Sequence, residues 1–271
     1  MAILRVHVRN PNTKTKYVMF LKNLFKKKKL KFTAYTYYEF SQRLFPIQLA
    51  KKMLPPAYSE VPLYHSGGDK VSCPYTKLTQ AIPYTRTIRH CDGILDLWGN
   101  SMIACAPFDL AINIKDNKVT FQTPEPDNLK VVQHNPAQYD KMFPDYVNLK
   151  FVCPWKIFSN KSVNCMFTPA FYHFDKDLRD SVIIPPGVVN YVNGADININ
   201  FFVKKQFLQK VIHIKAGTPL VYITPMTDES YTIDTELQSR ELWESTHSGF
   251  FAFKSRYKQY KQDRRKENLE N

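Results

Sequence analysis

The stretch SVIIPPGVVNYVNGADININFFV, residues Ser181–Val203, carries the pattern that decides the fold. From Asp196 onward, apolar side chains alternate with polar ones, as they do in a strand that buries one face. Proline, glycine and asparagine residues interrupt the stretch before that point, and these residue types favour turns. The stretch therefore predicts short strands joined by tight turns.

Further short, β-compatible stretches follow one another from residue 84 onward. Asp116-Asn117 separates two of them, as a hairpin turn would. The spacing predicts a mainly β fold, either a β-barrel or a two-sheet sandwich. The predicted strands are Thr85–Ile88, Met102–Ala106, Leu110–Ile114, Val119–Gln122, Tyr146–Val152, Ser162–Phe167, Ser181–Ile184, Ile197–Val203, Val211–Ile214 and Leu220–Ile223.

The segments that flank these strands differ from them in pattern. Residues 3–9, ILRVHVR, alternate as a strand does, and residues 35–53 predict a helix that Pro46 interrupts. Leu237, Leu242 and Trp243 have a helix-like spacing. The predicted divisions are a basic N-terminal region of mixed α/β character (1–56), an irregular connection (57–83), the β-rich domain (84–228) and a short helical, basic tail (229–271).

The formal net charge of +14 is concentrated at the two ends of the chain. Residues 1–55 hold 13 Lys and Arg residues against one acid, Glu39, and residues 254–266 hold seven bases against Asp263. The remainder of the chain is therefore slightly acidic. The basic ends, and not the middle, would meet an anionic partner.

A lysine-rich run with interleaved aromatic residues is the candidate binding segment for such a partner. Lysines neutralise phosphates and release counterions, and aromatic rings stack on exposed bases. Three interpretations stay open: a nucleic-acid contact, an arm that docks on an acidic protein, and a solvated basic arm. The candidate residues are Lys22, Lys26, Lys27, Lys28, Lys29 and Lys31.

The cysteines and the hydropathy pattern bear on where the chain works. Five cysteines, an odd number without a CxxC pair, predict reduced and mostly buried thiols. No apolar run reaches the length of a membrane span, and the N-terminus lacks the hydrophobic core of a signal peptide. We expect a protein that is neither secreted nor inserted in a membrane.

Residues 149–226 resemble the barrel of dUTPases and dCTP deaminases. The features that carry the likeness are a strand ending at Pro169, a Gly-Val-Val-x turn over residues 187–190 with an alternating strand after it, and a tight turn at Gly217 followed by an apolar strand. The resemblance implies a dUTPase-like β-barrel with a nucleotide pocket beside these turns.

The positions that carry the chemistry of that family are substituted here. The family has an aspartate that holds the attacking water where this chain has Asn190, and an amide cannot accept the proton. Pro169 is not followed by the Arg-Ser pair that grips phosphate, and Tyr222 replaces an expected glutamine. Asp196 is either a displaced acid or a solvent-facing strand residue. These four residues define a degenerate pocket, and we expect no catalytic residue.

A longer stretch, about residues 51–245, resembles an uncharacterised group of proteins from T4-like marine phages, including cyanophages. The segments that carry this likeness are Lys51–Pro55, Thr87–Cys91, Pro107–Asp109 and Pro154-Trp155. The group has no assigned activity. The resemblance implies a viral protein located in the virion or in the host cytoplasm.

Motifs for nucleophilic catalysis, phosphate loops and spaced metal ligands are absent from the sequence, so no cofactor and no metal is expected. The sequence predicts a non-catalytic phage protein that acts as a structural or partner-binding component, with a viral or host protein partner and a homo-oligomeric state. The alternatives are a nucleotide-binding or degenerate dUTPase-like protein and a non-specific nucleic-acid-binding accessory protein.

Overall fold

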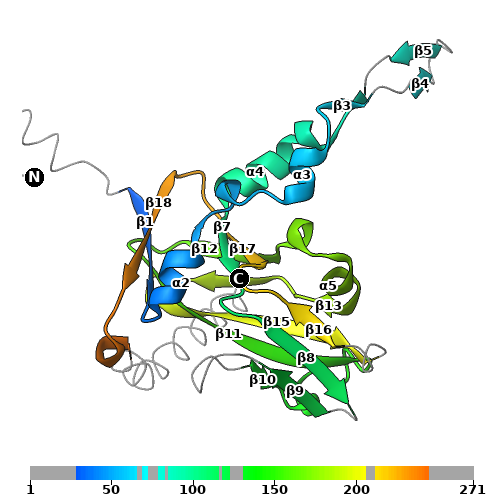
Figure 1. Ribbon diagram of the computed structural model, residues 1–271. Coiled ribbons are helices and arrows are strands. Elements are labelled where there is room, and N and C mark those ends of the chain that lie inside the picture. Colours follow the sequence, from blue (N-terminus) through cyan, green and yellow to red (C-terminus); the bar gives the residue numbers. More distant parts are fainter. Residues whose placement is uncertain are drawn as a thin grey trace, which may run out of the picture.

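The structure is a computed structural model that describes residues 29–65, 69–72, 79–82, 85–115, 118–122, 131–205 and 211–243. The described chain is mostly β, which confirms the predicted fold class at that level. Two larger sheets make up the body of the molecule, and Figure 1 shows a long projection leaving that body on one side.

The larger sheet has six strands and joins segments from both ends of the described chain. β1 is one of its inner strands, antiparallel to β11 on one side and parallel to β18 on the other. In spatial order the strands are β13 (Val182–Ile183), β15 (Ala195–Lys204), β11 (Tyr146–Ser159), β1 (Leu30–Thr36) and β18 (Tyr231–Leu237), with β10 (Val131–Gln133) also paired to β11.

The second sheet has five strands, and every pair in it is antiparallel. Its central strand, β17, is almost entirely buried, because it is covered on both faces. In spatial order the strands are β14 (Gly187–Asn190), β12 (Asn164–Pro169), β17 (Pro219–Pro225), β7 (Met102–Cys105) and β2 (Gln48–Leu49).

Smaller elements complete the body. A three-stranded sheet is made of β16 (Ile212–Ile214), β8 (Leu110–Lys115) and β9 (Lys118–Gln122). The short helices are α2 (Glu39–Leu44), η1 (Ala50–Lys52), η3 (Pro136–Gln138), η4 (Phe171–His173) and α5 (Lys176–Ser181). Asp175 caps α5, because its carboxylate accepts a hydrogen bond of 2.8 Å from the Leu178 amide.

The described residues between 61 and 91 form the projection, which we call the arm (Figure 1). Two helices at its base, α3 (Pro56–Glu60) and α4 (Asp92–Asn100), connect it to the body. Its elements are β3 (Tyr64–His65) paired with β6 (Thr85–Arg86), β4 (Asp69–Ser72) paired with β5 (Thr79–Ile82), and η2 (Ile88–His90). Residues 57–83 are expected to be an irregular connection, but their described part includes most of α3, the strand β3 and the antiparallel β4–β5 ladder.

One hydrophobic core joins the two larger sheets. β1 alternates strictly between buried and half-buried residues, and Phe32 is fully buried. Ile199 from β15 and Val221 from β17 belong to the same buried cluster. Because each sheet turns one face toward this cluster, apolar burial holds the sheets together.

The barrel alternative is wrong for the described residues, because the two sheets remain open and separate. The opening lies between β14 and β15. These two strands follow one another through the turn 191–194, yet β14 pairs with β12 and β15 pairs with β11. The two consecutive strands therefore belong to different sheets, and no main-chain ladder connects β14 with β15.

Strand β11 continues well beyond the predicted end at Val152. Its register against β15 shifts between Val152 and Lys156, which marks a bulge around Pro154. A bulge accommodates proline because its missing N–H would otherwise leave a gap in the ladder. Trp155 is buried in the core, as Trp98 and Trp243 also are.

The helical tail expected over residues 229–271 is wrong for residues 231–237, which form β18, whereas residues 240–243 are helical. Tyr231, Ile233 and Thr235 alternate with more exposed residues along this strand. Because β18 pairs with β1 in parallel, every second side chain of β18 turns toward the body and is partly buried there. The N-terminal region and the tail thus each contribute a strand to the main sheet, and the divisions drawn at residues 56 and 229 do not coincide with the sheet.

The described cysteines are free, and three of the four are buried. Burial raises the pKa of the Cys105 and Cys165 thiols to about 12, so they are neutral at physiological pH. Cys91 is exposed. In the described part of the chain, no helix combines the length and the apolar character needed to cross a bilayer.

Candidate functional site

A cavity of about 610 Å³ lies between β14 and β15, where the two sheets separate. We call it the interstrand cleft. Its walls are the whole of β14, the connection 184–186, the turn 192–194 and the first half of β15, with Phe167 and Val221 from the neighbouring strands. The cleft therefore results from the separation of β14 and β15, which follow one another in the chain but pair with different strands.

The turn that closes the cleft is held by specific contacts. The Asn190 side-chain amide donates to Ser162 Oγ at 3.0 Å and to Asn164 Oδ1 at 3.1 Å, and its oxygen accepts from the Val192 amide at 3.0 Å. Gly194 follows with a positive φ of 71°. These contacts fix the end of β14 against the connection between β11 and β12.

The side chains of the cleft combine apolar and amide groups. Phe167, Ile184 and Val221 line it together with exposed valines at 188 and 192. The amides are Asn190, Asn193, Asn198 and Asn200. The Asn200 Oδ1 atom is buried and has no hydrogen-bond partner among the described residues. Such a surface suits a ligand that donates hydrogen bonds and also presents apolar groups.

Asp196 provides the carboxylate in the described lining and lies directly opposite Lys156 in the β11–β15 ladder. The Lys156 residue is only 3% exposed, and its ammonium lies 4.9 Å from the centre of the Trp243 ring. Burial lowers the pKa of Lys156, and the Asp196 charge partly opposes that effect. The carboxylate therefore has a cationic neighbour within the sheet.

The four residues of the predicted degenerate pocket do not all come together. Asn190 and Asp196 both line the interstrand cleft. Tyr222 instead points toward α4, where its hydroxyl accepts a hydrogen bond of 2.8 Å from the Trp98 indole. Pro169 lies at the end of β12 opposite Val221 and is not part of the cleft lining. The reason for the split is the strand period of two, which sends Val221 and Tyr222 to opposite faces.

Two of the six candidate lysines lie within the described residues. Lys31 forms an ion pair of 2.7 Å with Asp234 across the β1–β18 pair, and this pairing raises the pKa of Lys31. Lys29 is exposed at the start of β1. The other four candidates, Lys22, Lys26, Lys27 and Lys28, lie outside the described residues, as does the basic stretch 254–266.

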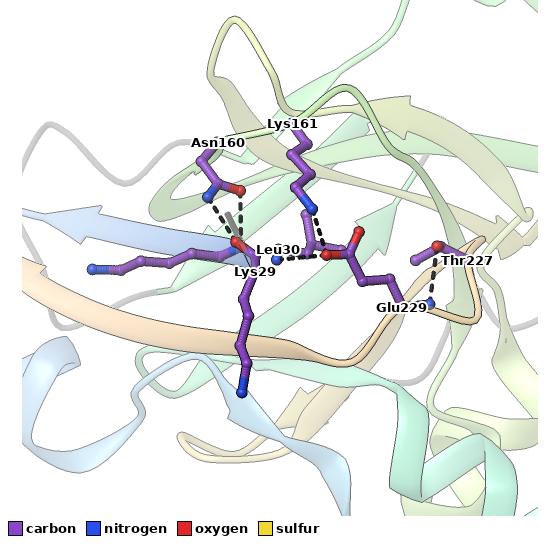
Figure 2. A network of polar contacts seen from close by, with 7 residues as sticks. Lys29, Leu30, Asn160, Lys161, Thr227 and Glu229 are labelled. Atoms are coloured by element: carbon purple, nitrogen blue, oxygen red, sulfur yellow. Dashed lines mark hydrogen bonds and ion pairs between the residues drawn. The ribbon is translucent and has the colours of Figure 1, made fainter. Parts of the chain in front are cut away.

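Polar contacts hold the start of β1 beside the turn between β11 and β12 (Figure 2). The Asn160 amide donates to the Lys29 carbonyl at 2.9 Å, and its oxygen accepts from the Lys31 amide at 2.9 Å. Glu229 accepts a hydrogen bond of 3.1 Å from the Leu30 amide and also binds the Lys161 ammonium. The described chain therefore begins next to the turn that contacts Asn190.

The arm presents a second candidate surface, which sequence reasoning missed. Leu63, Tyr64 and Ile88 are 49%, 51% and 41% exposed. Leu54 and Leu95 at its base are 40% and 42% exposed. Exposed apolar side chains on a projection mark interaction sites in many proteins. The signal was hidden, because these residues are scattered over forty positions of an apparently irregular segment.

Hydrogen bonds and ring contacts hold the base of the arm. Thr87 donates through its hydroxyl to the Pro62 carbonyl at 2.6 Å, and Arg89 donates to the Val61 carbonyl at 3.3 Å. The Arg89 guanidinium lies 5.7 Å from the centre of the Tyr58 ring, which in turn packs edge-on against Trp98. These contacts tie the arm to the body through α3 and α4.

The described residues contain no group of three or more His, Cys, Asp or Glu side chains that could hold a metal ion. Comparison with protein-family models, with curated proteins and with solved structures found no match. The assignment of function therefore depends on the surfaces of this chain alone.

Proposed function

We propose that this chain is a non-catalytic structural or partner-binding protein of a phage, and that it associates with a viral or host protein, or with copies of itself, through the arm. The observation that carries the proposal is the projection of the arm from the body with Leu63, Tyr64 and Ile88 partly exposed. The phage origin comes from the resemblance of residues 51–245 to the marine-phage group.

The arm suits association better than a role in stability. Burial is described for residues 61–65 and 85–92 of this region, and none of these residues belongs to the core or packs against it. Exposed apolar side chains on a projection lose contact with water only when a second surface covers them. Association would therefore use surface that the folded monomer leaves uncovered.

Mass photometry of the full chain at several concentrations tests this proposal. The double variant Leu63→Glu/Ile88→Glu should shift the distribution toward monomers, because it places carboxylates in the covered surface. The matched control Met142→Glu changes a residue that is 78% exposed and remote from the arm in sequence. An arm variant that assembles exactly as the control does would overturn the role of the arm.

Mass spectrometry of gradient-purified particles from the source virus addresses the location of the protein. Stoichiometric copies per particle would support a structural component in the virion. Absence from the particle, with expression in infected cells, would overturn that part of the proposal and leave an accessory role in the host cytoplasm.

A nucleotide-binding protein is the second candidate, and one observation favours it. Asn190 and Asp196 line one cavity at the turn where the dUTPase-like resemblance placed a pocket. The described lining has no lysine or arginine, so a base or sugar would be recognised more readily than a triphosphate. Thermal unfolding with dUTP or dCTP and magnesium tests it, since a ligand that binds only the folded state raises the melting temperature.

A further inference from the structure

The interstrand cleft is bordered by two strand edges that have no partner strand among the described residues. β14 ends the five-stranded sheet, and β13 covers only Phe202 and Val203 of β15. The edge of β15 before these residues therefore faces the cleft. Strand edges present rows of N–H and C=O groups, and the chemical complement of such a row is another extended peptide.

The side chains of the cleft specify which kind of peptide fits. Phe167, Ile184 and Val221 form an apolar wall, whereas Asn198 and Asn200 offer amide groups. A strand inserted between β14 and β15 would place every second side chain against each of these surfaces. The occupant should therefore alternate apolar residues with hydrogen-bond donors.

The chain itself contains a segment with this alternation. In residues 3–9, Leu4, Val6 and Val8 alternate with Arg5, His7 and Arg9. Arginine and histidine donate hydrogen bonds that an amide oxygen such as Asn200 Oδ1 can accept. The described chain starts at Lys29, whose carbonyl is bonded to Asn160, two residues before the Ser162 hydroxyl that binds Asn190.

The geometry of the connection permits the docking within one molecule. Residues 10–28 separate the segment from Lys29, and an extended chain of that length reaches up to roughly 60 Å. We propose that residues 3–9 of the same molecule occupy the interstrand cleft as an added strand between β14 and β15. The added strand would connect the two open sheets by main-chain hydrogen bonds.

Disulfide trapping in the full chain tests the proposal. Val6→Cys is combined with Val188→Cys, whose native side chain lines the cleft and is 59% exposed, in a background in which Cys73 and Cys91 are serine. Mild oxidation should give an intramolecular disulfide in the monomer, identified by peptide mass spectrometry. The control pair Val6→Cys/Met142→Cys should give at least tenfold less. Equal yields in the two pairs, or a disulfide-linked dimer, would overturn the proposal.

Hydrogen exchange gives a second measurement that does not depend on engineered cysteines. Replacing Leu4, Val6 and Val8 together by Asp should speed amide exchange in residues 187–190 and 195–201 at least tenfold, because the added strand no longer protects them. Exchange in β1 should remain unchanged. Unchanged exchange at the cleft, or protection of the cleft by dUTP alone, would contradict the docking of residues 3–9.

Discussion

Gly194 and His173 show how single residues shape the surroundings of the candidate sites. Gly194 has a left-handed φ of 71°, and a Cβ placed there would lie 2.2 Å from Phe158 Cε1. Only glycine satisfies both the backbone conformation and the close approach of the ring. His173 lies in η4 beside Tyr222, and its Nε2 atom is buried without a hydrogen-bond partner among the described residues.

The substitution Gly194→Ala should destabilise the fold by about 1–3 kcal/mol through backbone strain, with a further cost from the displaced Phe158 ring. Urea unfolding measures the effect. Gly187→Ala is the control, because a Cβ there meets no atom within 4 Å. A loss of stability that is equal in the two variants would show that the turn 191–194 does not require glycine.

Burial lowers the pKa of His173 from 6.5 to about 4, so the folded protein keeps the imidazole neutral where the unfolded chain would protonate it. The unfolded state then binds more protons between these two pH values, and stability must fall as the pH decreases from 6.5 toward 4. Above pH 6.5 His173 is neutral in both states, and its burial then causes no pH-dependent loss of stability.

We expect His173→Gln to remove about 1 kcal/mol of the stability difference between pH 7 and pH 5, after allowance for partial solvent exposure. Urea titrations at the two pH values provide the comparison. His65→Gln, on the exposed β3 strand, serves as the control. If the native protein and the His173 variant lose the same stability between pH 7 and pH 5, another group is responsible.

At the level of elements, α4 is attached to β17 by one buried polar contact. The Trp98 indole donates to the Tyr222 hydroxyl at 2.8 Å, and both side chains are almost completely buried. Burial raises the pKa of Tyr222 to about 12, so the hydroxyl stays protonated. This contact links the base of the arm to the core.

The variant Tyr222→Phe should cost about 1–3 kcal/mol, because it leaves the Trp98 N–H buried without an acceptor. Tyr231→Phe is the matched control, since its hydroxyl donates to the Asn100 carbonyl in an exposed position. Denaturant unfolding compares the two variants. A smaller loss for Tyr222→Phe than for Tyr231→Phe would contradict this account of how α4 is held.

The sequence predicted those elements whose own side chains determine them. Strands such as β8 and β17 were found because their apolar runs end at turn residues, and Gly217, where a tight turn was predicted, has a positive φ of 81°. The bulge that carries β11 past Pro154 was missed, because proline alone argues for a strand end. β18 was taken for a helix, since the parallel partner that uses its alternation is about 200 residues away.

The candidate site was predicted in part for the same reason. Asn190 and Asp196 lie close in sequence and meet at the cleft, whereas Pro169 and Tyr222 depend on the facing of strands that only the sheet determines. The fold class was therefore accessible from local pattern. The opening between the sheets could not be predicted in this way, because it depends on which sheet each of the consecutive strands β14 and β15 joins.

For the whole molecule, the division between body and arm predicts that the body determines the melting temperature and that the arm determines association. Replacing residues 64–86 by a short Gly-Ser linker should leave the melting temperature of the body within a few degrees, because the residues of that segment whose burial is described, 64, 65, 85 and 86, lie outside the core. The same variant should lose the association proposed for the arm. Calorimetry and mass photometry together make the measurement, and cooperative unfolding at a much lower temperature would show that the arm is part of the body.

The parallel pairing of β1 with β18 has a consequence for synthesis on the ribosome. β1 is among the first described segments to leave the exit tunnel, but β18, which covers one of its edges, comes last. Its other neighbour, β11, also follows more than a hundred residues later. The nascent chain must therefore carry an uncovered, partly apolar strand until residue 237 has left the tunnel, and the main sheet can close only after that point.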